Sequence, residues 1–202
     1  MAGVAFSIIV PTTGRPTLVQ TLASILEQLE PGDEVFVVRD DSDDLGDTPR
    51  NEAMPRARGT HLLFMDDDDQ YARGALATIR RFAAEHPGRI GIFRMRFDHG
   101  LVLWRRPALE FGNVSTQLLV VPNVPGKLAR WEQRGHVIGD YVFLTETAKL
   151  QGEPIFRNEI TVHARSDRRL VRRAIIRVRR LPVRLRYHAR RSRLRRLVSG
   201  LR

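Results

Sequence analysis

The stretch Leu62-Leu63-Phe64-Met65-Asp66-Asp67-Asp68-Asp69 joins an apolar run directly to four carboxylates. An apolar run of this length that stops abruptly predicts a buried β-strand. The acidic residues then lie at its C-terminal end, where open α/β sheets bind ligands. Four adjacent negative charges repel one another, and Mg²⁺ or Mn²⁺ would relieve that repulsion because both prefer carboxylate oxygen. The local sequence fits equally well a solvated acidic turn in which one Asp caps the next helix.

Strands and helices alternate through the first half of the chain. Short apolar, β-branched runs predict strands, and apolar residues at helical spacing predict helices. The predicted strands are 6–10, 35–38 and 60–65, and the predicted helices are 16–29, 48–58 and 71–86. We expect Pro11 to end the first strand and Pro55 to weaken the second helix. This alternation predicts a parallel sheet with right-handed crossovers, so the loops after the three strands meet at one edge.

The second half of the chain has a different pattern. We expect a hairpin around Asp98-His99-Gly100, a further strand closed by Pro122, and a helical stretch that Asp140 opens. The predicted elements are strands 90–97 and 101–104, strand 115–121, a short helix over 128–133, a helix over 140–150 and a last strand over 155–164. The predicted sheet is therefore larger than its three opening strands.

The composition limits the classes of protein to consider. The chain has 202 residues and no cysteine, which excludes disulfides and cysteine-ligated zinc and fits a reducing cytoplasm. The N-terminus lacks a basic region before its apolar residues and is a poor signal peptide. No apolar run approaches the roughly 18 residues that a membrane-spanning helix needs. We therefore expect a cytoplasmic protein.

The net charge of +11 is distributed unevenly. Residues 165–202 carry +15, with 16 Arg and one acid, so the preceding residues carry −4. We expect a domain over 1–164 and an Arg-rich tail over 165–202 in which an apolar helical stripe opposes the arginines. This pattern is typical of a helix on an anionic membrane surface. The alternatives are packing of the stripe on the body, disorder or nucleic-acid binding, the last disfavoured because only Tyr187 could stack on bases.

The residues at the predicted sheet edge indicate phosphate and metal chemistry. The sequence has no Gly-rich phosphate loop, no Gly-x-Ser-x-Gly motif and no His pair at metalloprotease spacing. A metal held by carboxylates at such an edge usually meets substrate phosphates. A transfer reaction would also need a base to deprotonate the incoming acceptor. Asp140 is a candidate, although an Asp near a helix start can equally be an N-cap.

Four motifs in register resemble family 2 glycosyltransferases, within the nucleotide-diphospho-sugar transferase superfamily. They are Ser7-Ile-Ile-Val-Pro-Thr-Thr-Gly-Arg-Pro-Thr-Leu18, the strand over 35–44 with its acidic end, Arg50-Asn51 with Ala57 and Gly59, and the apolar run into Asp66–Asp69. The resemblance covers about 1–90 well and 112–164 loosely. It implies a GT-A α/β fold, a mixed sheet flanked by helices, and inverting, metal-dependent transfer of a sugar from a nucleotide-diphosphate donor to an acceptor hydroxyl.

The resemblance also implies residue roles. Asp66 and Asp68 would bind Mn²⁺ or Mg²⁺ and the diphosphate, Asp140 would be the base, and His163 falls where some members have a His near the metal. A structural His in a strand is the alternative for His163. The implied donor-binding residues are Pro11, Thr12, Arg15, Asp40, Asp41, Arg50 and Asp67. The acceptor is not identified.

The chain departs from the family pattern at several positions. Arg39 precedes the acidic loop, Ala53 stands where Gly is expected, and Gly139 stands where Glu usually precedes the base. The predicted domain is also short for a GT-A enzyme. Two alternatives therefore stay open: a non-catalytic GT-A-like protein whose tail binds membrane or nucleic acid, and a nucleotidyltransferase whose phosphate loop would be 12–15.

Overall fold

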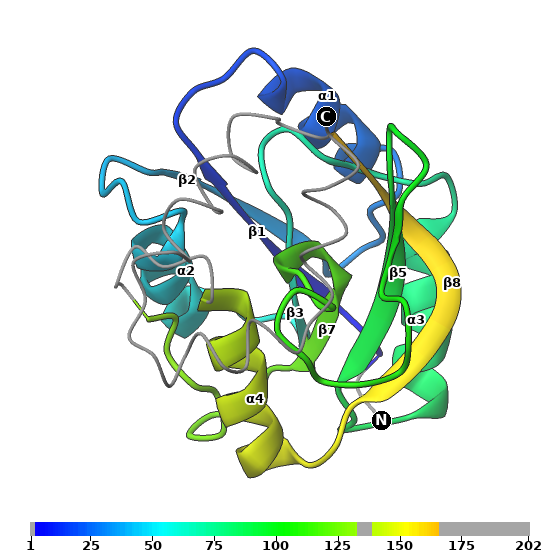
Figure 1. Cartoon of the computed structure of the whole chain (residues 1–202). Coiled ribbons are helices and arrows are strands. Elements are labelled where there is room, and N and C mark those ends of the chain that lie inside the picture. Colours follow the sequence, from blue (N-terminus) through cyan, green and yellow to red (C-terminus); the bar gives the residue numbers. More distant parts are fainter. Residues whose placement is uncertain (1–2, 133–138, 166–202) are drawn as a thin grey trace, which may run out of the picture.

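A computed structural model describes residues 3–132 and 139–165 of the chain (Figure 1). The elements in order are β1 (Phe6–Thr12), α1 (Leu18–Leu26), β2 (Glu34–Arg39), α2 (Asp47–Ala53), the 3₁₀ turn η1 (Met54–Arg56), β3 (His61–Phe64), β4 (Gln70–Tyr71), α3 (Ala75–Glu85), β5 (Gly91–Phe97), β6 (Val102–Leu103), the 3₁₀ turn η2 (Thr116–Leu118), β7 (Leu119–Pro122), α4 (Gly139–Gln151) and β8 (Ile155–Ala164). The predicted α/β class is confirmed.

The strands form one mixed sheet. Their order is β2-β1-β3-β7-β5-β8-β4, and β6 pairs with β5 outside this path. β1 pairs in parallel with β2 and β3, as the alternating pattern predicts, whereas β7 pairs antiparallel with both β3 and β5. The carboxyl ends of β1, β2 and β3 therefore meet at one edge of the sheet, and the acidic run follows β3 there.

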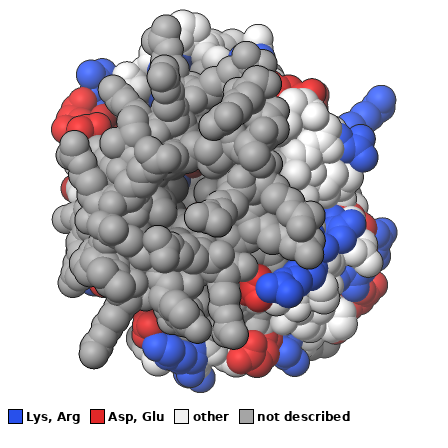
Figure 2. Space-filling view, viewed as in Figure 1, with Lys and Arg blue, Asp and Glu red and all other residues white. Residues whose placement is uncertain are grey.

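The described surface carries both signs of charge. In the view of Figure 2, Lys and Arg side chains are interspersed with Asp and Glu on the visible described surface. Exposed ion pairs join Lys149 to Glu146 at 2.6 Å and Arg157 to Glu159 at 2.7 Å. Such pairs stabilise the fold by only about 0–1 kcal/mol each. No helix among the described residues is long and apolar enough to cross a membrane.

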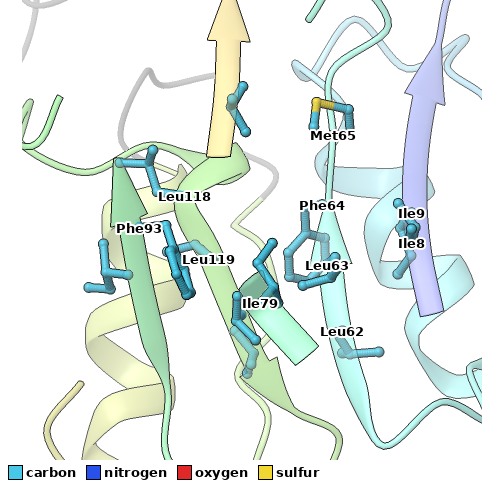
Figure 3. Packing of buried hydrophobic residues seen from close by; sticks show 14 of the residues in the cluster. Ile8, Ile9, Leu62, Leu63, Phe64, Met65, Ile79, Phe93, Leu118 and Leu119 are labelled. Carbon is cyan, nitrogen blue, oxygen red and sulfur yellow. The ribbon is translucent and has the colours of Figure 1, made fainter. Parts of the chain in front are cut away.

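The core lies around β3, whose side chains are buried on both faces of the sheet. Ile8, Ile9, Leu63 and Phe64 are fully buried, and Figure 3 shows β1 and β3 side by side with Ile8 and Ile9 on β1 and Leu63 and Phe64 on β3. Each such side chain contributes about 1.5–3 kcal/mol through removal from water. A strand covered on both faces needs an unbroken apolar run, and this explains Leu62–Met65.

Helices cover the sheet on opposite sides. In Figure 1, α4 lies in front of the sheet and α3 behind it. Phe143 of α4 contacts Phe64 of β3, with ring centroids 5.5 Å apart, and Phe82 of α3 contacts Phe93 of β5 at the same separation. Edge-to-face pairs of this kind stabilise packing beyond the area that they bury. The helices thus leave the carboxyl edge of the sheet for the polar loops.

Several predicted boundaries are wrong for identifiable reasons. β1 continues through Pro11 to Thr12. Pairing with β3 ends at Ile9, so no β3 residue needs a hydrogen bond from position 11, and a proline without an N–H is tolerated there. The helix predicted from residue 71 begins at Ala75, because Tyr71 belongs to β4 and pairs with Val162 of β8. Pro55 does weaken the helix over 48–58, which tightens into η1.

Two predictions in the second half are corrected by long-range contacts. The strand predicted over 115–121 begins with the turn η2, because the side chain of Gln117 bonds the acidic run. Residues 128–132 are not helical, because Asn51 bonds the backbone of Trp131 at both N–H and C=O. Residue 133 and the tail over 166–202 lie outside the described residues.

Candidate functional site

Asp66 is the first carboxylate after β3, and two side chains bind it. Arg50 Nη2 lies 2.7 Å from Oδ1, and Gln117 Nε2 donates to Oδ2 at 2.6 Å. The Asp66 side chain nevertheless keeps 40% of its surface exposed. Desolvation and the neighbouring charge of Asp67 raise its pKa, while Arg50 opposes the shift. Asp66 therefore faces both the core and the open edge of the sheet.

Asp67 is buried and fastens the acidic run to the end of β1. Thr12 Oγ1 donates to Asp67 Oδ2 at 2.7 Å, and the Thr13 backbone N–H donates to the same oxygen at 3.3 Å. Gly14 N–H in turn donates to Thr12 Oγ1 at 2.9 Å. These bonds bring the loop after β1 and the loop after β3 together, as the parallel pairing predicts.

Asp68 points toward the Arg15 side of the site. Arg15 Nη1 lies 2.6 Å from Asp68 Oδ2 and 3.5 Å from Asp67 Oδ1, so one guanidinium neutralises part of the run. The Asp68 side chain is 19% exposed. Desolvation first, and then the charge of Asp66, raise its pKa, while Arg15 opposes the shift. Burial is thus the main cause of the raised pKa of Asp68, and Arg15 offsets only part of it.

Asp69 is buried at the base of the run. Gln117 Nε2 donates to its Oδ2 at 2.7 Å, so one amide bridges Asp69 and Asp66. The Arg165 backbone N–H donates to Oδ1 at 2.9 Å, and Thr21 Oγ1 donates to the Asp69 carbonyl at 2.7 Å. Desolvation and the charge of Asp66 raise the pKa of Asp69 to about 8. Burial therefore favours the protonated form of this carboxyl.

Arg50 is the buried cation of the site, with 3% of its surface exposed. Its Nη1 donates to the Leu45 carbonyl at 2.9 Å and lies 3.8 Å from Asp47 Oδ1. Its guanidinium carbon lies 4.8 Å from the centroid of the Trp131 ring, which also stacks on Phe143 at 4.2 Å. A guanidinium held on an aromatic face and by a carbonyl keeps a fixed direction.

Asp140 lies in the first turn of α4, near the same cation. Its Oδ1 accepts a hydrogen bond from the Tyr141 backbone N–H at 2.7 Å. The pKa of Asp140 is raised to about 7, chiefly by desolvation and also by the charge of Asp66, while the Tyr141 hydrogen bond and Arg50 oppose the shift. Asp140 is therefore partly ionised near neutral pH, as a general base should be.

The loop after β2 divides into a site part and a solvent part. Asp41 is exposed and pairs with Arg39 at 2.9 Å, so the structure does not bring it to the acidic run. Asp40 is half-buried and accepts two hydrogen bonds from Ser42. A Cβ on Gly46 would lie 2.9 Å from Pro11 Cβ. The loop after β2 thus returns against Pro11 at the end of β1, on the way to Arg50.

The structure does not join His163 to the acidic run. Val162 and Ala164 of β8 are buried, whereas His163 between them is exposed, and no hydrogen bond or ion pair links it to Asp66 or Asp68. Among the described residues, no three His, Asp or Glu side chains are arranged as a metal site. Two carboxylates with substrate phosphates form a common Mg²⁺ site, so Asp66 and Asp68 fit a hard cation without a third protein ligand.

Sequence reasoning missed three contributors to the site. Gln117 lies in a segment predicted as a strand, Trp131 in one predicted as a helix, and Asp47 just before a predicted helix. The one signal in the sequence was Gly139, which stands where the family has Glu. In the structure a Cβ at residue 139 would lie 2.9 Å from Asp47 Oδ1. The carboxylate beside residue 139 therefore comes from Asp47 of α2.

The fold matches solved structures of glycosyltransferases. The S. aureus TarS 1–349 structure has a TM-score of 0.64 at 16% identity, over 86% of this chain and 65% of that one. The mannosyltransferase PcManGT from Pyrobaculum calidifontis, in complex with GDP-Man and Mn²⁺, has a TM-score of 0.61 at 18% identity, over 86% of this chain and 60% of that one. The chain has the GT-A fold. The resemblance drawn from the sequence is confirmed at this level.

The matched structures are similar to this chain in fold, at low sequence identity and over part of their length. A complex of TarS 1–349 with UDP-GlcNAc matches at a TM-score of 0.61 and 17% identity. The chain spans less than two thirds of the length of these structures, at 58–65%. No protein-family model and no curated protein matches the sequence. The comparisons therefore establish the GT-A architecture of the described residues.

Proposed function

We propose that the chain transfers a sugar from a nucleotide-diphosphate donor to an acceptor hydroxyl, with inversion at the anomeric carbon. One observation carries this proposal. In a chain with the GT-A fold, Asp66 and Asp140 both interact electrostatically with the buried guanidinium of Arg50. A TarS structure contains UDP-GlcNAc and the PcManGT structure contains GDP-Man and Mn²⁺, which supports a nucleotide-sugar donor.

Asp66 and Asp68 are the residues that would hold Mn²⁺ or Mg²⁺. They alternate with the buried Asp67 and Asp69, and theirs are the partly exposed side chains of the run. Arg15 and Arg50 supply two positive charges beside the three carboxylates of Asp66, Asp67 and Asp68. A bound cation would supply positive charge for the leaving diphosphate. We propose that Thr12, Arg15 and Asp67 shape the donor pocket beside it.

Asp140 is the proposed general base. A carboxylate with a pKa of about 7 can accept a proton from the acceptor hydroxyl as that oxygen forms its bond to the sugar. The nucleoside diphosphate then departs with the electrons of the broken glycosidic bond. Arg50 lies beside Asp66 and would oppose the negative charge that develops on the diphosphate.

A panel assay tests this function. The full-length chain is incubated with UDP-, GDP- and dTDP-sugars, with and without Mn²⁺, and the released nucleoside diphosphate is measured. We expect release from one nucleotide class, strengthened by Mn²⁺ and by the correct acceptor. Release of pyrophosphate from a nucleoside triphosphate in place of this activity would support a nucleotidyltransferase.

We also propose that residues 166–202 bring the enzyme to an anionic membrane surface, near a lipid-linked or cell-envelope acceptor. The support is the sequence pattern alone, an apolar stripe opposed by arginines. Flotation with vesicles that contain anionic lipid should carry the full chain, and replacing Arg168, Arg169, Arg172 and Arg173 by Gln should reduce its recovery. Binding to duplex DNA at physiological salt without vesicle binding would support the nucleic-acid alternative.

A further inference from the structure

The carboxylate of Asp47 lies directly against the first residue of α4. A Cβ on Gly139 would lie 2.9 Å from Asp47 Oδ1, closer than real Cβ atoms come to their neighbours, and 3.0 Å from Oδ2. Any side chain at 139 would therefore displace Asp47. Because a helix N-terminus carries partial positive charge, a carboxylate at this place also favours the start of α4.

Asp47 is buried among charges from three parts of the fold. Its exposed fraction is 4%, and its Oδ1 lies 3.8 Å from Arg50 Nη1. The pKa of Asp47 is raised to about 7, chiefly by desolvation. The charge of Arg50 opposes this shift, and three carboxylates contribute to it: Asp44, Asp140 and Asp40. A buried carboxylate is costly unless it is paired, so this position requires a function or a compensating contact.

Asp47 connects the two elements that bear the reactive groups. Arg50 follows it by one turn in α2, and Asp140 follows Gly139 in α4. We propose that Asp47 is a positioning residue, whose carboxylate between Arg50 and Gly139 sets the relative placement of the buried cation and the base. The kinetic consequence rests on the proposed function, whereas the contact between α2 and α4 does not.

A thermodynamic cycle tests the contact without any substrate. Urea unfolding is measured for the full-length wild type, Gly139→Ala, Asp47→Ala and the double variant. We expect Gly139→Ala to lower the unfolding midpoint, because its methyl group collides with the Asp47 carboxylate. That loss should shrink or vanish in the Asp47→Ala background. An equal loss in both backgrounds would overturn the proposed contact.

The effect of the Asp47 charge on the base is tested by the titration of Asp140. The carboxyl carbon of Asp140 is followed by ¹³C NMR against pH and assigned by its absence in Asp140→Asn. We expect Asp47→Asn to move the midpoint to lower pH, since a nearby negative charge no longer opposes ionisation of Asp140. Asp41→Asn, an exposed residue of the same loop, is the control and should leave the midpoint unchanged. An unshifted midpoint in Asp47→Asn contradicts the proposal.

Kinetics separate positioning from packing. With an active donor and acceptor, Asp47→Asn should lower kcat by about tenfold to a hundredfold, because small displacements of reacting groups are costly. The ascending limb of its rate–pH profile should also move to lower pH. Wild-type activity and an unmoved profile would reject the positioning role. If the wild type transfers no sugar, the proposed function fails, and the urea and NMR measurements still decide the inference.

Discussion

Asp66 and Asp68 differ from the two aspartates that alternate with them. Asp67 and Asp69 are buried and hydrogen-bonded to Thr12 and to the Arg165 backbone, so they fasten the loop. The other two retain exposed side-chain surface. Four identical residues follow the third strand, and only the family resemblance singled out Asp66 and Asp68 in the sequence. Exposure separates the same two residues, because the side chains of Asp66 and Asp68 are 40% and 19% exposed whereas Asp67 and Asp69 are buried.

Replacing Asp140 by Asn should remove the base while preserving shape. We expect kcat to fall by about 10²–10⁴-fold, as for loss of a general base. Donor affinity should be unchanged, because the proposed role of Asp140 is to deprotonate the acceptor and not to bind the donor. The measurement is steady-state transfer together with donor binding. Glu153→Gln should retain wild-type activity, because Glu153 is exposed in the turn between α4 and β8. Full activity of Asp140→Asn would remove Asp140 from this role.

The rate should depend on pH through Asp140. The base works only when ionised, and its pKa is raised to about 7 by desolvation and by Asp66. We therefore expect kcat to be low below neutral pH and to rise through about pH 7. The rate–pH profile, measured at saturating donor and metal, checks this. A rate that stays constant as pH falls well below 7 would show that another group accepts the proton.

The elements around β3 were predictable where local patterns control them. Apolar runs and helical spacing locate β1, β3 and α3, because these elements bury a continuous face. The segment at Trp131 escaped prediction, because its backbone bonds Asn51, 80 positions earlier in the chain. No local pattern contains a contact of that separation. The turn η2 escaped for the same reason, since the bonds of Gln117 are to the acidic run.

Truncating Asn51 should loosen the segment that holds Trp131. Asn51→Ala removes a donor at 2.8 Å and an acceptor at 2.9 Å from buried backbone groups, and we expect a loss of about 2–4 kcal/mol in unfolding free energy. Urea denaturation measures this loss. Asn158→Ala on β8 is the control, because Asn158 is exposed and should change stability by less than about 0.5 kcal/mol. Equal effects of the two variants would contradict the account of this segment.

The whole molecule should respond to pH through its surplus of buried carboxyls. Asp47, Asp69 and Asp140 have pKa values of about 7–8 in the fold, raised chiefly by desolvation. Unfolded Asp titrates near about 4, so the folded chain holds more protons between these values. The free energy of unfolding should therefore be greatest near about pH 4 and fall as pH rises toward about 8.

Urea unfolding midpoints between about pH 5 and pH 8, without divalent cations, measure this dependence. We expect Mn²⁺ to raise the midpoint more at the alkaline end, because protons and metal compete for the same carboxylates. Asp69→Asn should flatten the pH dependence, since it removes the carboxyl with the highest of these pKa values. A midpoint that rises steadily over this range would contradict the charge balance described for the site.

The edge of the sheet after β3 is the centre of the proposed function, because a donor diphosphate would bind there with a metal. The direct measurement is calorimetric titration of UDP-, GDP- and dTDP-sugars into the full-length chain, with and without Mn²⁺, for the wild type, Asp68→Asn and the exposed control Glu153→Gln. We predict that one nucleotide class binds with Mn²⁺-dependent affinity, that Asp68→Asn loses the gain from Mn²⁺, and that Glu153→Gln keeps it. Binding of no nucleotide sugar, or equal Mn²⁺-dependent binding by Asp68→Asn, would contradict the claim.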